Sequence, residues 1–203
     1  MIRIALTKGR IEKKAIELLT EAGYDCSELV DKGRKLVFKL KNADIEVVLA
    51  KAADVITYIE HGVCDAGIVG EDTIMEHGKW FHEILDLGFG KCKFALAGIK
   101  GMNFYEGYSH KVIASKYPKV TKNFFNQKGI DVEIVKIEGS VELAPILNLA
   151  DAIVDIVETG STLRENGLEV YEDVAYISTR LIVNTASIKL KKAEIDDLVK
   201  RLS

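Results

Sequence analysis

Residues 151–167 place acids, hydroxyls and glycines in an order that suits the binding of a sugar phosphate. An apolar, β-branched run that contains Asp151 and Asp155 predicts a buried strand, and the segment 158–162 predicts a turn that leads into a short helix ended by Gly167. Glycine allows the backbone to turn tightly, and hydroxyls beside amide N–H groups at a helix N-terminus favour an anion. The pattern therefore predicts a site for a phosphate monoester.

Asp155 is expected at the carboxyl end of this strand. An acceptor-only carboxylate there can take hydrogen bonds from the vicinal hydroxyls of a ribose. The loop after it is also typical of an ordinary turn with a helix cap, which by itself is the simpler interpretation. The acidic strand before the loop shifts the balance toward a sugar phosphate. The loop residues expected to contact it are Glu158, Thr159, Gly160, Ser161 and Thr162.

The elements that must position this loop alternate between strands and helices along the whole chain. Strands are expected at residues 2–6, 45–50, 66–69, 112–115, 132–137, 168–177 and 181–183, and helices at 11–22, 54–62, 72–78, 120–128 and 193–202. Asp54 and Asp72 are expected to cap two of these helices, and Ser140 is expected to open another. Segment 32–40 is expected to form one arm of a hairpin. The alternation indicates an α/β fold with mostly parallel strand pairing, in which ligands gather at the carboxyl ends of strands.

Composition excludes several functional classes. The chain has 203 residues, 48% hydrophobic and 29% charged residues and a net charge of −3, which is typical of a globular protein and argues against broad nucleic-acid binding. No apolar run approaches the roughly 18 residues of a membrane span, and the N-terminus has no signal-peptide pattern, so we expect a cytoplasmic protein. The three cysteines and four histidines lack metal-ligand spacing, which makes a protein-held metal site improbable.

The motifs together resemble the ATP phosphoribosyltransferase family. Residues 151–167 look like the phosphoribosyl-diphosphate loop of that family, and the similarity extends to residues 139–145, 149–151, 5–10, 65–72, 85–92 and 180–184. It therefore covers almost the whole chain. The resemblance implies a glycosyltransferase that transfers phosphoribosyl from phosphoribosyl diphosphate to N1 of ATP with release of diphosphate, in the first step of histidine biosynthesis.

The resemblance also implies the architecture. We expect a two-lobed fold like that of the type II periplasmic binding proteins, with a cleft between the lobes. Residues 1–90 and 180–203 would form lobe one, on the nucleotide side, and residues 91–179 would form lobe two, which carries the phosphoribosyl-diphosphate loop.

Matching positions supply the expected site residues. Those for phosphoribosyl diphosphate are Asp151, Asp155, Glu158, Thr159, Gly160, Ser161, Thr162, Glu138 and Ser140. Those for ATP are Lys8, Gly9, Arg10 and Arg34. The catalytic candidates are Asp155, Arg10 and Lys51. Lys51 stands where the family usually has arginine, which keeps the charge but loses the planar fork that binds two oxygens at once. Mg²⁺ is expected as the cofactor, bound through the substrate diphosphate.

The sequence stops at Ser203, which resembles the short form of the family. The resemblance then implies a homodimer within a hetero-oligomer that contains a regulatory subunit related to histidyl-tRNA synthetase. Two alternatives stay open. A solute-binding protein with the same architecture would be expected to carry a secretion signal and to need no sugar-phosphate loop. A phosphoribosyltransferase for another base would share the loop and differ in the lining of the base site.

Overall fold

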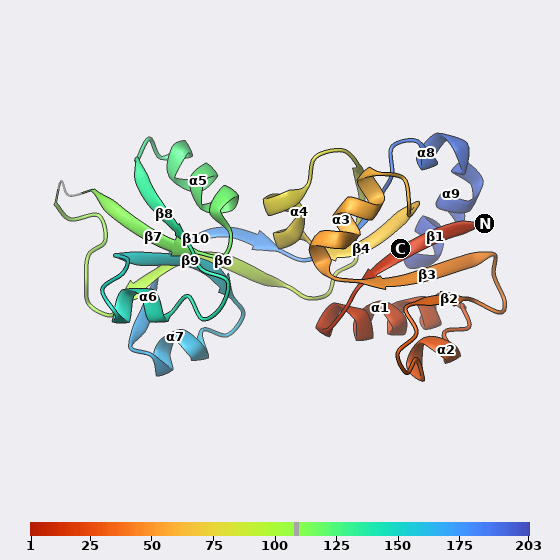
Figure 1. The fold of residues 1–203 in the computed structure, drawn as a ribbon, viewed down its shortest axis with the longest axis horizontal. Helices are drawn as coiled ribbons and strands as arrows, with labels where there is room; N and C mark the ends of the chain where they lie inside the picture. The colour runs from red at the N-terminus through yellow and green to blue at the C-terminus, as the bar shows by residue number, and fades with distance from the viewer. Residues whose placement is uncertain (108–109) are drawn as a thin grey trace. The chain divides into compact units, whose positions relative to one another are not determined.

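The computed structural model describes residues 1–107 and 110–203 and divides the chain into two compact units (Figure 1). Unit 1 comprises Met1–Gly90 and Ser178–Ser203, and unit 2 comprises Lys91–Ile177. The chain thus enters unit 2 once and returns once. Among the described residues, each unit is built on one sheet, of six strands in unit 1 and five in unit 2.

The sheet of unit 1 has the strand order β2-β3-β1-β4-β11-β5. Its strands are β1 (Ile2–Thr7), β2 (Val37–Lys39), β3 (Ile45–Ala50), β4 (Ala66–Gly70), β5 (His82–Asp86) and β11 (Thr179–Val183). β1 pairs in parallel with β3 and β4, so the carboxyl ends of these three strands share one edge of the sheet. β2, β11 and β5 add antiparallel pairings on the two sides.

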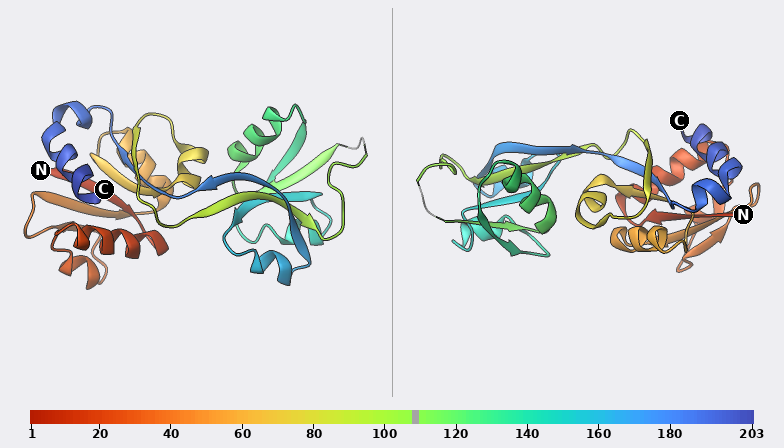
Figure 2. Two further views of the ribbon diagram at one scale, coloured as in Figure 1. Left: turned by 180° about the vertical axis from the view of Figure 1, so that it is seen from behind. Right: turned by 90° about the horizontal axis from the view of Figure 1, so that it is seen from above.

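Helices cover both faces of this sheet (Figure 2). They are α1 (Arg10–Glu21), α2 (Ser27–Val30), α3 (Ala52–Glu60), α4 (Glu71–His77), α8 (Ser187–Leu190) and α9 (Lys192–Leu202). Side chains of β1 alternate between the faces, as the period of two requires. Ile4 and Leu6 pack with residues of α1 and α9, whereas Ala5 packs with residues of α3.

The sheet of unit 2 has the strand order β10-β6-β9-β7-β8. Its strands are β6 (Cys92–Ile99), β7 (Lys111–Ser115), β8 (Val132–Lys136), β9 (Ala152–Val157) and β10 (Leu168–Ile177). β7 pairs in parallel with β8 and β9, and β6 pairs antiparallel with β9 and β10. α6 (Leu143–Ile146) and α7 (Ser161–Glu165) contribute to a core on one face, and α5 (Pro118–Gln127) lies over the other face (Figure 1).

The α/β alternation is confirmed, but parallel pairing is limited to β3, β1 and β4 at the centre of the sheet of unit 1 and to β9, β7 and β8 at one side of the sheet of unit 2. The hairpin strand β2, the strand β6 that enters unit 2, and the strands β10 and β11 of the returning chain all pair antiparallel. Both sheets are therefore mixed. A strand that follows a hairpin or runs back between units reverses direction, whereas only strands joined through a crossover helix run parallel.

Three expected helix caps lie two or three residues away from the observed N-cap residues. α3 follows Lys51 and α4 follows Gly70, so Asp54 and Asp72 lie in the first turn of each helix instead of capping it. Both strands run almost directly into their helices, which leaves no loop residue for a side-chain cap. An acid in the first turn is favoured by the helix dipole much as a cap is, so the two arrangements share one sequence pattern. Ser140 precedes α6, which begins at Leu143.

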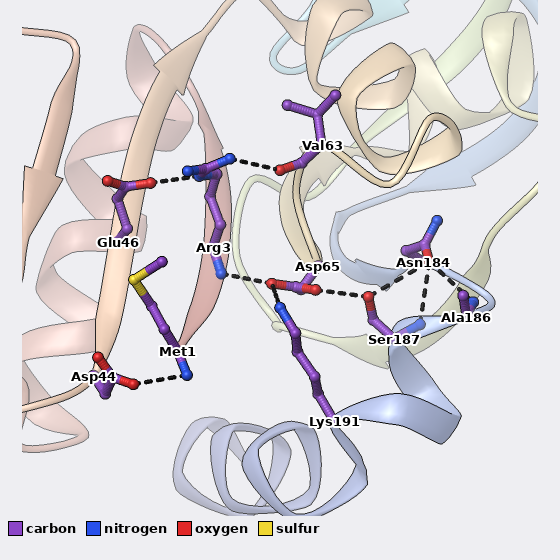
Figure 3. A network of polar contacts seen from close by, with 10 residues as sticks. All are labelled: Met1, Arg3, Asp44, Glu46, Val63, Asp65, Asn184, Ala186, Ser187 and Lys191. Atoms are coloured by element: carbon purple, nitrogen blue, oxygen red, sulfur yellow. Dashed lines mark hydrogen bonds and ion pairs between the residues drawn. The ribbon is translucent and has the colours of Figure 1, made fainter.

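A buried polar network joins the N-terminal strand of unit 1 to its C-terminal helices (Figure 3). Asp65 accepts hydrogen bonds from the Arg3 backbone N–H at 2.8 Å, the Ser187 hydroxyl at 2.7 Å and the Lys191 ammonium at 2.8 Å. Burial alone would raise the pKa of Asp65, but these bonds outweigh it and lower the pKa. Asn184 caps the start of α8 by accepting the Ala186 and Ser187 N–H groups.

Within residues 1–107 and 110–203, no helix combines the length and the apolar character that crossing a membrane requires.

Candidate active site

The segment between β9 and α7 forms the hydroxyl-rich turn expected from the sequence. Gly160 has φ +70°, a left-handed conformation that glycine adopts without a steric penalty, and the chain turns there into α7. The Thr159 and Ser161 hydroxyl oxygens lie 3.0 Å apart, and both residues are exposed. The first amides of a helix have no carbonyl partner within it, so N–H groups and hydroxyls collect at this turn. Such a turn can hold a phosphate.

Residues within and after α7 hold the loop in this shape. Arg164 donates from Nη1 to the Thr159 carbonyl at 3.0 Å, and Asn166 donates from Nδ2 to the Thr162 carbonyl at 2.8 Å. Leu163 is buried in the core against the sheet. Arg164 was not expected from the sequence, and only its position four residues after Gly160 connects it with the loop.

Asp155 lies within β9, two residues before its end, and not at its end as expected. It shares a face of the sheet with Ile153 and Val157, and this face packs against residues of the α6 and α7 segments. The pKa of Asp155 is raised to about 6, mainly by burial and in addition by the nearby charge of Glu142, against the lowering effects of the Ile156 N–H and Lys116. A carboxyl group with this pKa changes charge close to physiological pH.

Lys116 and Glu142 were missed by the sequence analysis. Lys116 directly follows β7, whose last residue Ser115 pairs with Val154 of β9 on one side and with Lys136 of β8 on the other. Its charge lowers the pKa of both Asp155 and Glu138. Sequence distance hides this proximity. The sheet register brings Lys116 beside the other two strand ends, and a sequence-based rule that pooled residues after all parallel strands would have found it.

Glu138 and Ser140 follow the end of β8 at this same edge of the sheet, and both are exposed. Glu138 forms an ion pair of 2.7 Å with Lys136, which lowers the pKa of Glu138. The chain after Ser140 then folds across β9, since Val141 and Ala144 pack in one core with residues of that strand. The structure therefore brings this segment toward Asp155 and the loop. We call residues 116, 138–142, 155 and 158–162 the loop edge of unit 2.

Asp151 is not part of the loop edge. It lies just before β9, at the opposite end of the strand from the loop. Its carboxylate accepts the Val112 N–H at 2.7 Å, and its own N–H donates to the Val112 carbonyl at 2.8 Å. These bonds give Asp151 a structural role in joining β9 to β7. The acid belongs to the same sequence motif as Asp155, but the length of the strand separates them.

In unit 1, the expected ATP residues meet at the shared carboxyl edge of β1 and β3. The Lys8 N–H donates to the Ala50 carbonyl at 2.9 Å, which places residues 8–10 beside Lys51. Gly9 has φ +104° and ψ −136°, a conformation available mainly to glycine. Lys8, Gly9, Arg10 and Lys51 are all exposed.

Arg34 belongs to the same edge although 24 residues separate it from Arg10 in the sequence. It sits in a turn closed by the Lys35 N–H donating to the Lys32 carbonyl at 3.0 Å. The chain then reaches β3, where the Leu49 N–H donates to the Leu36 carbonyl at 2.8 Å. Because β2 runs antiparallel to β3, the turn before β2 lies at the carboxyl end of β3. We call residues 8–10, 32–34 and 51 the basic edge of unit 1.

Among the described residues, no group of three or more histidine, cysteine, aspartate or glutamate side chains is placed to hold a metal ion. The three cysteines carry reduced thiols, buried at Cys26 and Cys64 and half-buried at Cys92.

Comparison with known proteins gives a consistent result. A family model described as HisG, ATP phosphoribosyltransferase, matches residues 51–203. The ATP phosphoribosyltransferase of Clostridium kluyveri is 62% identical over 201 residues, which are 99% of this chain and 92% of that protein. The enzyme of Clostridium acetobutylicum is 61% identical over 99% of this chain and 94% of its own length.

A solved structure is similar to the whole chain. It is described as an ATP phosphoribosyl transferase (HisG:HisZ) complex from Thermotoga maritima. The matched chain is 34% identical with a TM-score of 0.85, and the match covers 100% of this chain and 96% of that one.

Proposed function

The chain belongs to the ATP phosphoribosyltransferase family, and from this premise we propose that its two sheet edges divide the two substrates between them. The protein transfers the phosphoribosyl group of phosphoribosyl diphosphate to N1 of ATP and releases diphosphate, which is the first step of histidine biosynthesis. In our proposal the loop edge of unit 2 binds phosphoribosyl diphosphate and the basic edge of unit 1 binds ATP. The single observation that supports it best is the hydroxyl-lined turn after the strand that carries Asp155.

The 5-phosphate is assigned to the turn. Thr159, Ser161 and Thr162 offer hydroxyl and amide donors there, and Gly160 lets the backbone come close to the phosphate oxygens. Glu158 begins the turn, and its carboxylate is assigned to a ribose hydroxyl in place of the phosphate, because like charges repel.

The ribose is assigned to Asp155, which is two residues from the turn on the core-facing side of β9. An ionised carboxylate accepts both vicinal hydroxyls, and substrate binding at neutral pH therefore draws the group fully into its charged form. Lys116 is close enough to lower the pKa of Asp155, and Ser140 follows β8 at the same edge of the sheet; we assign both to the diphosphate oxygens. Asp151 is left out of the site because its carboxylate serves the Val112 backbone.

ATP is assigned to the basic edge, where Lys8, Arg10, Arg34 and Lys51 supply positive charge from three adjacent backbone segments. Lysine at position 51 acts as a point charge on a phosphate oxygen and does not form a bidentate contact. These four cations match the several negative charges of a triphosphate.

The chemistry requires positioning and charge stabilisation more than covalent help. The N1 lone pair of ATP forms a bond to C1 of the ribose while the C1–O bond breaks and its electron pair leaves with diphosphate. Positive charge develops on the ribose ring and negative charge on the leaving group, so Asp155 on the ribose side and Lys116 on the diphosphate side lower the barrier, while Arg10 and Lys51 hold the triphosphate of ATP. Mg²⁺ accompanies the diphosphate as part of the substrate, which suits an ion that keeps several waters and uses few protein ligands.

We also propose that the protein is a homodimer within a hetero-oligomer, with a regulatory subunit related to histidyl-tRNA synthetase, in the cytoplasm. The support is the similarity to the chain of the HisG:HisZ complex along its whole length. No nucleic-acid or membrane partner is proposed, in keeping with the net charge of −3.

A diphosphate-release assay tests the assignment of the acceptor. The protein is supplied with phosphoribosyl diphosphate, Mg²⁺ and either ATP or a free purine or pyrimidine base, with and without the regulatory subunit. We expect release only with ATP, and loss of release when Thr159 and Thr162 are both changed to valine. Release with a free base but not with ATP would contradict ATP as the acceptor.

A further inference from the structure

We propose that Glu12 is a positioning residue that holds both glycine-containing segments of the basic edge, residues 8–10 and 32–34, in the geometry that binds ATP. The inference rests on the proposed assignment of ATP to this edge. Glu12 itself would not touch the nucleotide, because it is buried in the first turn of α1 and only 5% exposed.

The contacts of Glu12 reach both segments. Its Oε2 accepts the Gly9 N–H at 3.2 Å, and its Oε1 forms an ion pair with the Lys32 ammonium. Lys32 is 20 residues away in the sequence and begins the turn that carries Arg34. One carboxylate therefore links the turn after β1 to the turn before β2.

Both segments need such a link because glycine gives each of them conformational freedom. Gly9 has φ +104° and Gly33 has φ +54°, and a backbone at glycine can leave such a conformation at little cost. Gly9 is also the residue before α1 and has no side chain to cap the helix, so the hydrogen bond that Glu12 accepts from the Gly9 N–H is a side-chain contact that fixes this helix start. Without it, Lys8 and Arg10 would sample many orientations and lose entropy on binding a phosphate.

The charge of Glu12 matters as well as its hydrogen bonds. A buried carboxylate is tolerated when it is paired and hydrogen-bonded, and Lys32 provides the pairing. In this turn the Lys32 ammonium is engaged by Glu12 and the exposed Lys35 ammonium pairs with Glu28 at 3.1 Å, while Arg34 is exposed. Glu12 thus makes Lys32 an anchor of the turn, and Arg34 faces solvent.

Three variants test the inference on the full chain. Glu12→Gln keeps an oxygen acceptor for the Gly9 N–H but loses the ion pair, Lys32→Met removes the other half of that pair, and Glu12→Ala removes both contacts. We expect the KM for ATP to rise about 10-fold to 100-fold in Glu12→Ala and by a smaller factor in the other two. The KM for phosphoribosyl diphosphate should stay within about twofold of the wild-type value, because its proposed site is in unit 2.

Asp65→Asn is the matched control. Asp65 is also a buried carboxylate of unit 1 that accepts one backbone N–H and pairs with one lysine, and it is 6% exposed. Loss of its charge should lower thermal stability much as Glu12→Gln does, with no change in the KM for ATP. An equal rise in the KM for ATP in Asp65→Asn would show a general effect of destabilisation and overturn the inference.

Direct variants of the basic edge separate this inference from the proposed function. If Lys8→Ala and Arg34→Ala raise the KM for ATP but the folded Glu12→Gln and Lys32→Met variants do not, Glu12 does not position the edge. If none of the four variants changes the KM for ATP, the assignment of ATP to this edge is itself wrong, and the role of Glu12 falls with it. A rise in the KM for ATP in all four variants, with no rise in Asp65→Asn, supports both the assignment of ATP to this edge and the positioning role of Glu12.

Discussion

Asp155 combines a buried position with a role that requires charge. Burial against the α6 and α7 segments raises its pKa to about 6, from an ordinary value of 3.8. Ribose binding in our proposal uses the ionised form. At neutral pH the buried, ionised carboxylate therefore lowers the free energy of unfolding of the unliganded protein. Such a loss of stability is common at residues that act on substrates.

The first prediction follows from this pKa. The folded protein binds a proton at Asp155 more tightly than the unfolded chain does, so the contribution of this group to the free energy of unfolding falls as pH rises from about 4 to about 6. Asp155→Asn removes that dependence. At pH 8 we expect the variant to be more stable than the wild type by up to about 3 kcal/mol, measured by urea unfolding, and the gap should shrink toward pH 4.

Asp155→Asn should raise the stability of the protein at high pH but lower its catalytic activity. In the wild type, kcat/KM for phosphoribosyl diphosphate should rise as pH passes through about 6, and this rise should be absent in a much less active Asp155→Asn variant. Full activity of the variant at low substrate concentration would show that the carboxylate is structural.

Sequence reasoning found the loop residues because their chemistry is local. Thr159, Gly160 and Ser161 carry the hydroxyls and the left-handed turn within three consecutive positions. It did not find Lys116 and Glu142, whose proximity to Asp155 depends on strand order and on the fold of the α6 segment. It also grouped Asp151 with Asp155, whereas the structure places Asp151 before β9 at the far end from the loop, because a motif in the sequence does not show which end of a strand each acid occupies.

At the scale of elements, the strands and longer helices were predictable from periodicity and glycine stops. α1 ends before Gly23 and α5 before Gly129, both with positive φ, as their positions in the sequence indicate. The starts of α3 and α4 were less predictable, because an acid in the first turn gives the same pattern as an acid at the cap. The pairing of the returning strands could not be read from local sequence, because antiparallel pairing there is decided by the path of the whole chain.

The Asp65 network gives an element-scale prediction. Because this carboxylate joins β1, β4 and the α8 and α9 segment, Asp65→Asn should lower the free energy of unfolding by about 3 kcal/mol at pH 7. The pKa of Asp65 is lowered in the folded protein, so its stabilisation is fully present above the ordinary value of 3.8 and is lost as pH falls through the lower folded value.

Urea unfolding between pH 3 and pH 7 measures this effect. The difference between wild type and Asp65→Asn should narrow at the acidic end. A difference that stays constant across the range would mean that the charge of Asp65 does not stabilise unit 1.

At the scale of the whole molecule, residues of unit 1 come from both ends of the sequence, and unit 2 is a continuous insertion between them. The family could be recognised from motifs spread along the chain, and the comparisons confirm it. For the whole molecule we propose assembly with a regulatory subunit. Coupling between an effector and a catalytic site requires two distinct binding sites, and we place the second on the partner.

Histidine sensitivity tests that placement. We expect diphosphate release by the purified 203-residue chain to be unaffected by histidine, and inhibition to develop when the regulatory subunit is added. The same titration run on both preparations is sufficient. Strong inhibition of the chain alone would mean that a histidine site lies within these residues.

A crossed binding measurement shows whether the two edges divide the substrates between them. Calorimetry compares two double variants, Thr159→Val with Thr162→Val in unit 2 and Lys8→Ala with Arg34→Ala in unit 1, against both substrates. We predict that the unit 2 variant weakens the binding of phosphoribosyl diphosphate by about 1.5–3 kcal/mol per lost charge-assisted bond and leaves the binding of ATP unchanged. The unit 1 variant should weaken the binding of ATP and leave that of phosphoribosyl diphosphate unchanged. Unchanged affinity for phosphoribosyl diphosphate in the loop variant, or equal losses for both substrates in either variant, would contradict the account.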